Sequence, residues 1–349
     1  MRRILIIKPS SMGDVVHAFP AVHALLAADS SLTVDWVIHP AFAELLDYLP
    51  GIRKKILFRR EELGRLSSFF PAAAAFLREL RKERYDAVID LQGLFRSALI
   101  GLLARGKCLY GPRLAKEFPA RFCYRKKLHT SKEIRHAVEK NCEMIRDFSG
   151  LDQVPPRYSL PRVEKYAEQA ERLLASVGLT GKPFIAVAPG ARWKTKQWPP
   201  RFFADCIGKM AQQMPEESFV LLGSPSEKKL GDAVEEAVDG KVPVLNLCGK
   251  TSTGELAELI RRADLLFCND SGPMHLAAAA GTPVVALFGP TDPALTGPYS
   301  RESRVIRPEL NCLGCLRKQC ETEACHAAVS PRTVADRALE LLRKGGVSK

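Results

Sequence analysis

The turn Asn269-Asp-Ser-Gly-Pro-Met-His275 holds the residues best suited to bind an anion. It follows the apolar run 265–268 and precedes a stretch of small residues that stops at Gly281. Proline is favoured at the first position of a helix and glycine at its C-cap, so the sequence predicts a strand, a tight turn and a helix. Unpaired N–H groups and the helix dipole make such a helix start, near Gly272, a favourable place for a phosphate.

Polar side chains of the same turn would complete this site. Asp270 and Ser271 offer acceptors and a hydroxyl suited to sugar hydroxyl groups, and His275 can donate to a phosphate oxygen. The alternative is that Asp270 and Ser271 only cap the helix, as these residue types commonly do. Glycine-containing turns after other predicted strands favour the ligand site.

Two of those turns lie in the same half of the chain. The first carries basic and aromatic residues that could hold a pyrophosphate and cover a base: Arg192, Trp193, Lys194, Lys196 and Trp198. The second, Leu222-Gly-Ser-Pro-Ser-Glu227, is typical of a phosphate or ribose loop that opens a helix. Glu227 would also complement the dipole of that helix.

The N-terminal turn Lys8-Pro-Ser-Ser-Met-Gly-Asp14 follows the first apolar run. It has one glycine and lacks Gly-Lys-Ser/Thr, so it is neither a dinucleotide fingerprint nor a P-loop. The segment 15–27 has helical spacing, with Pro20 accommodated only at an irregular or kinked first turn. Asp14 therefore lies at a strand-to-helix junction, where capping the helix is the alternative role.

Strand and helix patterns alternate through most of the 349 residues. This pattern predicts an α/β protein of two Rossmann-like, doubly wound domains facing across a cleft, with ligands at the carboxyl ends of the strands. We expect an N-terminal domain over 1–155 and a C-terminal domain over 156–330, joined within a proline-rich segment. A C-terminal helix within 331–349 is expected to pack back on the N-terminal domain.

The formal net charge of +13 indicates anionic partners. Between Arg105 and Lys140, eleven basic residues accompany three acidic ones, with phenylalanine and tyrosine interleaved. A phosphorylated lipid at an anionic membrane fits this segment better than RNA, because no nucleic-acid-binding module is recognisable. Apolar runs are too short to cross a bilayer and no signal-peptide pattern is present, so we expect a cytoplasmic protein.

Four of the ten cysteines cluster near the C-terminus as Cys312-x2-Cys315-x4-Cys320-x4-Cys325. In a cytosolic protein, this spacing favours a structural metal over disulfides. Zinc is one candidate and an iron–sulfur cluster another, although the paired C-x2-C knuckles of common zinc sites are absent. Free thiols or an oxidised pair remain the alternatives.

Taken together, these motifs resemble the ADP-heptose:lipopolysaccharide heptosyltransferase family. The resemblance runs from Ile4 to about Thr333 and rests on several separated motifs: Ser10-Ser-Met-Gly-Asp14, Asp90-Leu-Gln-Gly93, Lys194-Thr-Lys-Gln-Trp-Pro199, Leu222-Gly-Ser224, Asn269-Asp-Ser-Gly-Pro-Met-His275 and Phe288-Gly-Pro-Thr-Asp292. It implies the GT-B fold and inverting transfer of heptose from ADP-heptose to the lipopolysaccharide inner core, without a metal or other catalytic cofactor. It also implies a peripheral position on the cytoplasmic face of the inner membrane.

Site roles follow from the same resemblance. Asp14 would be the general base for the acceptor hydroxyl, and Lys196 would stabilise the departing diphosphate. The expected donor contacts are Ser11, Met12, Gly13, Lys194, Gly223, Ser224, Glu227, Asp270, Ser271, Gly272, Pro273 and His275. The expected contacts to a phosphorylated Kdo-lipid A type acceptor are Arg96, Arg113, Lys116, His136 and Lys140.

Two other hypotheses stay open from the sequence. One keeps the GT-B fold but uses another nucleotide-sugar, because the base-binding turn does not distinguish adenine from uracil. The other is a nucleotide-sugar or RNA-binding protein without transfer activity, in which the segment 105–140 carries the affinity. Loss of transfer in Asp14→Ala, with ADP binding retained, would separate the enzymes from the binding protein.

Overall fold

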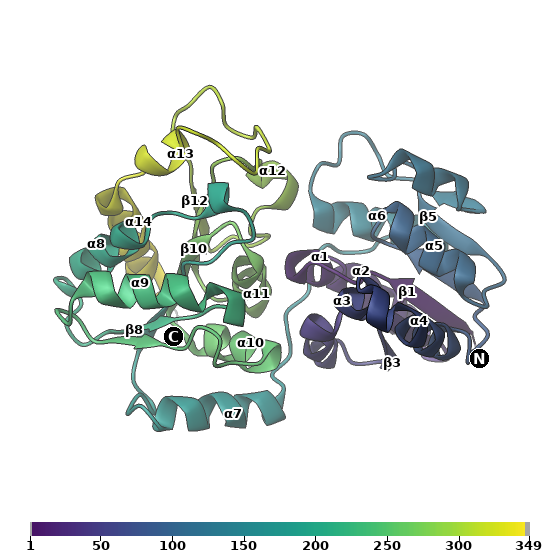
Figure 1. Ribbon diagram of the computed structural model, residues 1–349, viewed down its shortest axis with the longest axis horizontal. Coiled ribbons are helices and arrows are strands. Elements are labelled where there is room, and N and C mark those ends of the chain that lie inside the picture. Colours follow the sequence, from purple (N-terminus) through teal and green to yellow (C-terminus); the bar gives the residue numbers. More distant parts are fainter. Residues whose placement is uncertain (1, 346–349) are drawn as a thin grey trace. The chain divides into compact units, whose positions relative to one another are not determined.

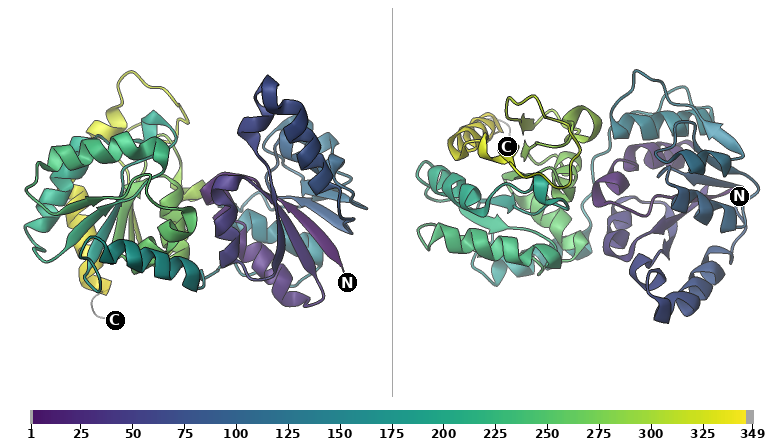
Figure 2. Two further views of the ribbon diagram at one scale, coloured as in Figure 1. Left: turned by 60° about the horizontal axis from the view of Figure 1, so that its bottom comes forward. Right: turned by 45° about the horizontal axis from the view of Figure 1, so that its top comes forward.

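The computed structural model describes residues 2–345, and the chain divides between Tyr158 and Ser159 into two compact units. Each unit is built on a six-stranded parallel sheet (Figure 1). In the views of Figure 2, the strands of each sheet lie between helices. Two doubly wound units confirm the predicted α/β class, and the division falls within the proline-rich segment.

The first unit has the strand order β3-β2-β1-β4-β5-β6. Its strands are β1 (Arg3–Ile7), β2 (Thr33–Ile38), β3 (Ile52–Leu57), β4 (Ala87–Asp90), β5 (Leu109–Pro112) and β6 (Lys126–Leu128). All six residues of β2 and all four of β4 are buried, as expected for parallel strands covered on both faces. The sequence pattern missed β5 and β6, which lie in the basic segment.

Helices of the first unit connect these strands. They are α1 (Met12–Val16), α2 (Phe19–Ala28), η1 (Pro40–Tyr48), α3 (Arg60–Leu63), α4 (Leu66–Leu80), α5 (Phe95–Leu103), η2 (Phe118–Phe122) and α6 (Ala137–Ser149). The helix expected over 15–27 is broken into α1 and α2. Pro20 lies in the first turn of α2, where its missing N–H costs no hydrogen bond.

The second unit has the strand order β12-β11-β10-β7-β8-β9. Its strands are β7 (Phe184–Ala188), β8 (Ser218–Leu221), β9 (Val244–Asn246), β10 (Leu265–Asn269), β11 (Val284–Leu287) and β12 (Ser303–Ile306). Its helices are α7 (Glu164–Ala175), η3 (Lys194–Lys196), α8 (Pro200–Ala211), η4 (Pro225–Glu227), α9 (Lys228–Val238), α10 (Thr253–Arg262), α11 (Gly272–Ala280), α12 (Pro293–Thr296), α13 (Ala324–Ala327) and α14 (Pro331–Gly345).

The C-terminal helix α14 belongs to the second unit, where it packs against α8. Val334, Ala335, Ala338 and Leu341 are buried in the core of that unit. An apolar stripe of this kind on an amphipathic helix is buried by the nearest open sheet face, and here that face belongs to the same unit. Residues 346–349 lie outside the described part.

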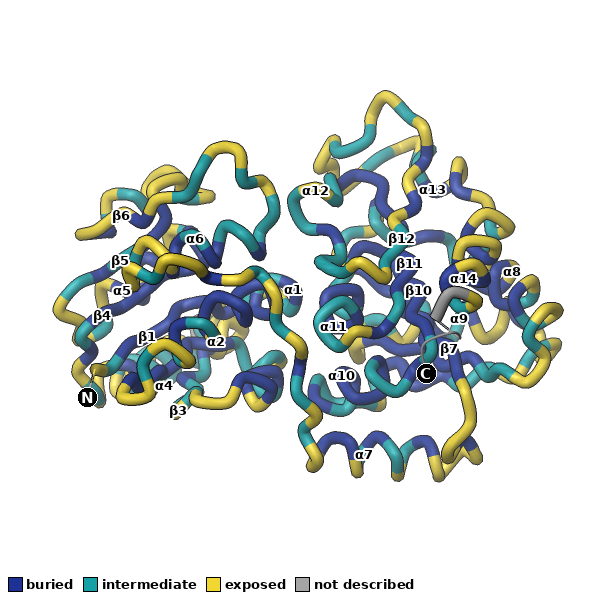
Figure 3. The backbone as a smooth tube through the Cα atoms, turned by 180° about the vertical axis from the view of Figure 1, so that it is seen from behind, coloured by how far each residue is buried: buried dark blue, intermediate teal, exposed yellow. Residues whose placement is uncertain are grey.

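The cores lie against the sheets. Figure 3 shows strands such as β1 and β10 as buried, whereas much of the surface of α7 is exposed. Within residues 2–345, no helix combines the length and the apolar character needed to span a bilayer.

Candidate functional site

Asp14 lies in the first turn of α1, directly beyond the carboxyl end of β1. Its Oδ2 accepts from the backbone N–H of Ser11 at 3.2 Å and from the Ser11 hydroxyl at 3.3 Å. The capping role predicted as the alternative is therefore present. The other oxygen, Oδ1, lies 3.2 Å from Nζ of Lys116 and 3.9 Å from Nζ of Lys8. The Asp14 carboxylate thus accepts hydrogen bonds within the turn and also lies beside the ammonium groups of Lys8 and Lys116.

Lys8 is the buried member of this group. Its side chain is 4% exposed, and Nζ donates to the carbonyl of Leu91 at 2.6 Å. Burial lowers the pKa of Lys8 to about 8, against the opposing effect of Asp14. Burial also acts to raise the pKa of Asp14, but Lys8 and Lys116 outweigh it and hold that pKa well below its usual value. Asp14 is therefore ionised at neutral pH.

The Asp90-Leu-Gln-Gly93 turn positions both lysines. Asp90 is fully buried, and its carboxylate accepts from the hydroxyls of Tyr124 and Ser97 at 2.7 and 2.8 Å and from the N–H of Gln92 at 2.8 Å. Burial raises the pKa of Asp90 despite these bonds. The same turn presents the Leu91 carbonyl to Lys8, so this motif supports the site from behind.

Gly93 fixes the loop that carries Lys116. Its φ of 73° favours glycine, and a Cβ there would lie 3.0 Å from Pro112 Cγ and 3.3 Å from the backbone nitrogen of Lys116. The Gly93 carbonyl also accepts from the N–H of Glu117 at 3.2 Å. Close backbone approach at this glycine therefore holds Lys116 within reach of Asp14.

Among the expected acceptor residues, Lys116 and His136 lie near Asp14. His136 is the N-cap of α6, and its ring lies 5.6 Å from that of His17, one turn after Asp14. Asn141 of α6 donates to the carbonyl of His17 at 3.1 Å, which fixes α6 beside α1. Lys140 follows His136 by one turn and is half-buried.

Two other expected acceptor residues lie elsewhere on the first unit. The guanidinium of Arg96 lies over the ring of Phe58, 5.9 Å from its centroid. Arg113 is exposed, and its backbone N–H donates to the carbonyl of Leu128 at 2.8 Å. Neither geometry directs these side chains to Asp14.

In the second unit, Lys196 and Asp270 form an enclosed ion pair. Their side chains are 17% and 5% exposed, and Lys196 Nζ lies 2.6 Å from Asp270 Oδ2. The Thr291 hydroxyl donates to the same oxygen at 2.5 Å. Lys196 also lies over the ring of Trp193, 4.8 Å from its centroid. The turns after β7, β10 and β11 thus meet at one carboxylate.

The predicted anion site at the start of α11 has the expected backbone. The helix begins at Gly272 with Pro273 in its first turn, and it ends at Gly281 with φ 80°. The Ser271 hydroxyl is buried and has no hydrogen-bond partner among the residues that the structure describes. His275 is also buried. Ser271 is thus in the N-cap position without capping the helix, which leaves its hydroxyl available to a ligand.

Asn269 joins the loops around this helix start. The side chain is fully buried; its Nδ2 donates to the Pro189 carbonyl at 2.8 Å, and its Oδ1 accepts from the Trp198 N–H at 3.1 Å. One amide therefore satisfies two buried backbone groups at the two ends of the basic turn. The indole N–H of Trp198 donates to Val329, so this tryptophan anchors the loop to the core.

Glu227 lies against the glycine that opens the basic turn. Its Oε2 accepts from the N–H and the hydroxyl of Ser224, both at 2.7 Å, in a capping box. A Cβ at Gly190 would lie 2.1 Å from Oε1 of Glu227, so no larger residue fits there without displacing the carboxylate. Gly223 also packs on the Glu227 side chain. The second predicted loop therefore adjoins the first.

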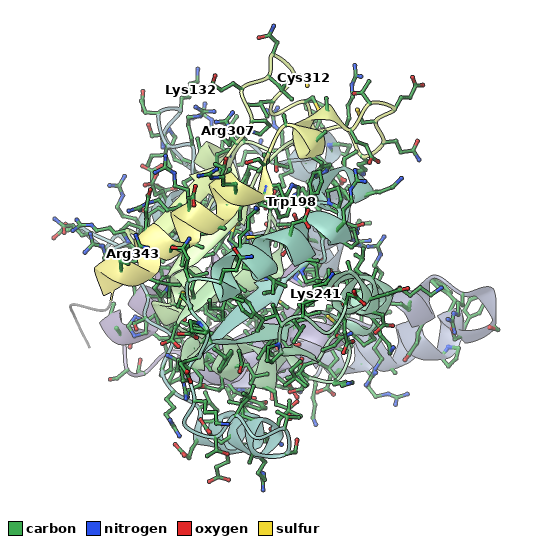
Figure 4. The ribbon with its side chains drawn as sticks, turned by 90° about the vertical axis from the view of Figure 1, so that its left-hand side faces the viewer. Lys132, Trp198, Lys241, Arg307, Cys312 and Arg343 are labelled. Atoms are coloured by element: carbon green, nitrogen blue, oxygen red, sulfur yellow. The ribbon has the colours of Figure 1, made fainter. Side chains whose placement is uncertain are left out.

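The structure does not show the expected zinc or iron–sulfur site at the four clustered cysteines. All are free thiols, and within residues 2–345 no group of three or more His, Cys, Asp or Glu side chains is arranged to hold a metal ion. Cys312 and Cys315 are exposed, the thiol of Cys320 lies 3.5 Å from the Thr322 hydroxyl, and Cys325 packs towards Gly289. Figure 4 shows Cys312 on the loop between β12 and α13. Burial raises the pKa of the Cys325 thiol, and the neighbouring thiols of Cys312, Cys320 and Cys315 add to this, so the four cysteines lie close together.

This cysteine loop instead supports the basic turn. The Thr195 hydroxyl donates to the Arg317 carbonyl at 2.7 Å, and Nε2 of His326 lies 2.7 Å from the Thr195 carbonyl. Lys194, whose side chain is 81% exposed, pairs with Glu323 of the same loop at 3.3 Å. The loop therefore contacts Lys194 and Thr195, the two residues that precede Lys196.

Sequence reasoning missed Lys8, Thr291 and the linking role of Asn269. Lys8 directly follows the buried apolar residues 4–7 of β1, and its position was a signal that the side chain starts inside the sheet. Asn269 and Thr291 both lie in motifs that the sequence singled out. Their partners are loops distant in sequence, which no local pattern reveals.

Comparisons with known proteins agree with this arrangement. The model of glycosyltransferase family 9 (heptosyltransferase) matches residues 73–326. Lipopolysaccharide heptosyltransferase 1 of Escherichia coli K12 is 30% identical over 310 residues, covering 87% of this chain and 93% of that protein. Lipooligosaccharide heptosyltransferase 2 of Haemophilus influenzae is 28% identical over 363 residues, covering 98% and 99%.

Solved structures give the same relationship. The structure of E. coli ADP-heptose lipopolysaccharide heptosyltransferase II has a TM-score of 0.79 at 25% identity and covers 99% of this chain and 100% of its own. An E. coli heptosyltransferase with ADP has a TM-score of 0.79 at 26% identity and covers 97% and 99%.

Proposed function

Because this chain belongs to glycosyltransferase family 9, the heptosyltransferases, we propose that it transfers heptose from ADP-heptose to the inner core of lipopolysaccharide. An acceptor hydroxyl attacks the anomeric carbon, the bond from that carbon to the diphosphate breaks, and ADP leaves. The hydroxyl proton passes to a carboxylate of the protein. Attack opposite the leaving group inverts the configuration at the anomeric carbon.

The observation that carries this proposal is the state of Asp14. Its carboxylate lies at the carboxyl edge of the first sheet, is 26% exposed, and is kept ionised by Lys8 and Lys116. A general base must be unprotonated and within hydrogen-bond reach of the hydroxyl it serves. Lys116 is 56% exposed and can turn towards an anionic acceptor, and that movement would make Asp14 a stronger base at the moment of binding.

For the donor, we propose the turns of the second unit. The diphosphate would lie at the start of α11, where the Ser271 hydroxyl has no partner among the described residues and the helix dipole favours an anion. Lys196 would then move from Asp270 to the charge that develops on the leaving ADP. Glu227 and Ser224, beside Gly190, are placed to contact the ribose.

For the acceptor, we propose a phosphorylated Kdo-lipid A type molecule. Such an acceptor is anionic, and Lys116 and His136 lie near Asp14 to receive it. Its lipid anchor confines the reaction to a bilayer surface, so we place the enzyme peripherally on the cytoplasmic face of the inner membrane. Similarity to lipopolysaccharide heptosyltransferases 1 and 2 supports an inner-core acceptor.

The test is turnover with the purified chain, ADP-heptose and a Kdo-lipid A acceptor, followed by mass spectrometry of the product. Asp14→Asn should lower the rate by about 10²-fold or more, the usual contribution of a general base. ADP affinity, measured by calorimetry, should stay within a few-fold. Near-normal turnover by Asp14→Asn would refute the assigned base. Turnover with only a UDP-, GDP- or dTDP-sugar would refute the donor.

A further inference from the structure

Exposed apolar side chains are unevenly distributed over this protein. Twelve large hydrophobic residues are exposed in the described part of the chain, and nine of them belong to α4, α5 and the segment 114–122 of the first unit. These nine are Phe69, Phe70, Phe95, Leu99, Leu102, Leu103, Leu114, Phe118 and Phe122. Single exposed hydrophobic residues are common, but a set gathered on adjoining elements marks an interaction surface.

Helix α5 shows most clearly that apolar side chains face outward. Phe95, Leu99, Leu102 and Leu103 follow the spacing of one helix face, and they are 42%, 39%, 53% and 43% exposed. The opposite face of α5 is buried through smaller residues such as Ala98. A helix at the surface of a globular protein normally turns charged residues outward, so this outer face lacks its covering partner.

The 3-10 helix η2 packs beside α5 and continues the surface. Phe118 and Phe122 are 62% and 78% exposed, and their rings meet edge to face at 5.3 Å. Between them, Ala120 is fully buried and attaches the turn to the core. The guanidinium of Arg121 lies 5.0 Å from the centroid of the Phe118 ring. The short turn thus exposes two aromatic rings and a cation, while buried Ala120 attaches it to the core.

The three elements lie on one side of the first sheet. Leu80 of α4, Ala98 of α5 and Ala120 of η2 share a core cluster with Leu5 and Val88 of the strands. In Figure 1, α4 and α5 both lie on the near side of this sheet. We call the nine exposed side chains the apolar face.

Charge beside α5 and the segment 114–122 is almost entirely basic, whereas α3 and α4 carry both signs, with Glu61, Glu62 and Glu79 among their residues. From Phe95 to Lys127 the sequence has nine basic residues and only one acidic residue, Glu117. The Glu117 carboxylate accepts from the N–H of Phe95 at 2.7 Å and is therefore used at the start of α5. Exposed basic side chains in this stretch are Arg96, Arg105, Lys107, Arg113, Lys116, Arg125, Lys126 and Lys127.

We propose that the apolar face docks on a lipid bilayer that carries anionic headgroups. The phenylalanine and leucine side chains enter the headgroup boundary, and the surrounding lysines and arginines pair with lipid phosphates. Electrostatic attraction of the basic residues and burial of apolar area both strengthen such binding. The inference rests on the proposed function for its biological setting, because a lipid-linked acceptor is found at such a surface.

The charge distribution selects the bilayer over a second copy of the chain. Two apolar faces brought together would place one basic surround against another, and like charges at an interface are repulsive. A bilayer of anionic lipids instead offers apolar depth and negative charge in one partner. The pairing of aromatic rings with basic residues is also typical of segments that lie at membrane interfaces.

The experiment measures co-sedimentation of the full chain with vesicles of phosphatidylethanolamine and phosphatidylglycerol, and with vesicles of phosphatidylcholine. We expect binding to the anionic vesicles that weakens as salt is raised. Phe118→Ser/Phe122→Ser and Leu102→Gln/Leu103→Gln should each weaken this binding about tenfold or more. The matched control is Val177→Ser/Val305→Ser, which changes two exposed apolar residues of the second unit and should bind like the unchanged chain.

A fluorescence experiment tests insertion directly. Phe122→Trp should give blue-shifted tryptophan emission when anionic vesicles are added, beyond the response of the unchanged chain. Equal vesicle binding by the two double variants and the unchanged chain would overturn the proposal. Two other results would also overturn the proposal. One is a dimer, seen by light scattering, that the double variants abolish. The other is RNA binding in place of vesicle binding, again abolished by the double variants.

Activity on a soluble acceptor keeps this proposal separate from the proposed function. With an acceptor sugar that lacks its lipid, the double variants should turn over ADP-heptose at the unchanged rate. Loss of vesicle binding with this activity intact would support docking by the apolar face. Absence of all transfer with normal vesicle binding would refute the enzyme assignment and leave the docking surface standing.

Discussion

Lys8 Nζ and Asp14 Oδ1 lie 3.9 Å apart, the lysine enclosed by the first unit and the carboxylate open to solvent on one side. The lysine is held by the Leu91 carbonyl at the Asp90 turn, so its charge has a fixed position behind the proposed base. Lys116 approaches the same oxygen from an exposed loop. Of the two cations, only Lys8 is built into the core.

Replacing Lys8 by methionine should therefore change how the rate depends on pH. Without the buried cation, burial of Asp14 is less opposed, so its pKa rises and more of the base is protonated in acid. We expect the acid limb of the kcat/KM profile to move to higher pH, with a loss of roughly tenfold at the acid end for each unit moved. Lys107→Met, a change at a side chain that is 79% exposed, is the control. An unchanged profile would exclude a role for Lys8 in positioning the charge of Asp14.

The same lysine should affect stability at alkaline pH. Its folded pKa is about 8 and its ordinary value is 10.5, so between these values the unfolded chain retains a proton that the folded chain has lost. Stability contributed by this group therefore rises with pH through that window, by up to about 3 kcal/mol. Urea unfolding at pH 7.5 and pH 9.5 should show the rise in the unchanged chain. Equal slopes in Lys8→Met and the unchanged chain would contradict it.

Lys196→Met tests the proposed role in leaving-group departure. If Lys196 stabilises charge that develops on ADP, kcat at saturating ADP-heptose should fall about 10²–10³-fold, as for other preorganised donors. Lys241→Met changes an exposed lysine of the same unit and should have no effect. A rise in KM with an unchanged kcat would assign Lys196 to ground-state binding instead.

Gly190→Ala tests the contact between the two donor turns. The new methyl group would collide with the Glu227 carboxylate, so we expect KM for ADP-heptose to rise about tenfold or more, while the fold is retained. Gly208→Ala is matched to it, because a Cβ at Gly208 meets nothing within 4 Å. Calorimetric titration measures the ADP affinity of the Gly190→Ala and Gly208→Ala variants directly, without turnover. Equal affinities in the two variants would remove Glu227 from the donor site.

The second unit was the more predictable part of the chain. Five of its strands follow apolar runs in the sequence, and both limits of α11, Gly272 and Gly281, could be inferred from local rules. Strand β12, which contains Ser303 and Arg304, was missed. Strands β5 and β6 were missed because both are short, β5 ends in glycine and proline, and β6 contains two lysines. In such strands, pairing along the edge of the sheet determines the structure and no hydrophobic pattern reports it.

Site chemistry was predictable where a side chain acts locally. Asp14 and Asp270 could be selected from their turns, and the structure surrounds both with cations. The contribution of Lys8 could not be deduced, because its burial depends on a turn more than 80 residues away. The zinc or iron–sulfur site expected from the cysteine spacing stays a prediction, because within residues 2–345 no metal-holding group of side chains is found.

Asn269 fastens Pro189 and Trp198 with one buried amide. Hydrogen bonds to Asn269 therefore hold both ends of the intervening segment 190–197 at the sheet, whichever residues lie between them. Substitutions within segment 190–197 can therefore change which nucleotide or sugar the site accepts without unfolding the second unit. It is the place at which we would begin to engineer a new donor preference.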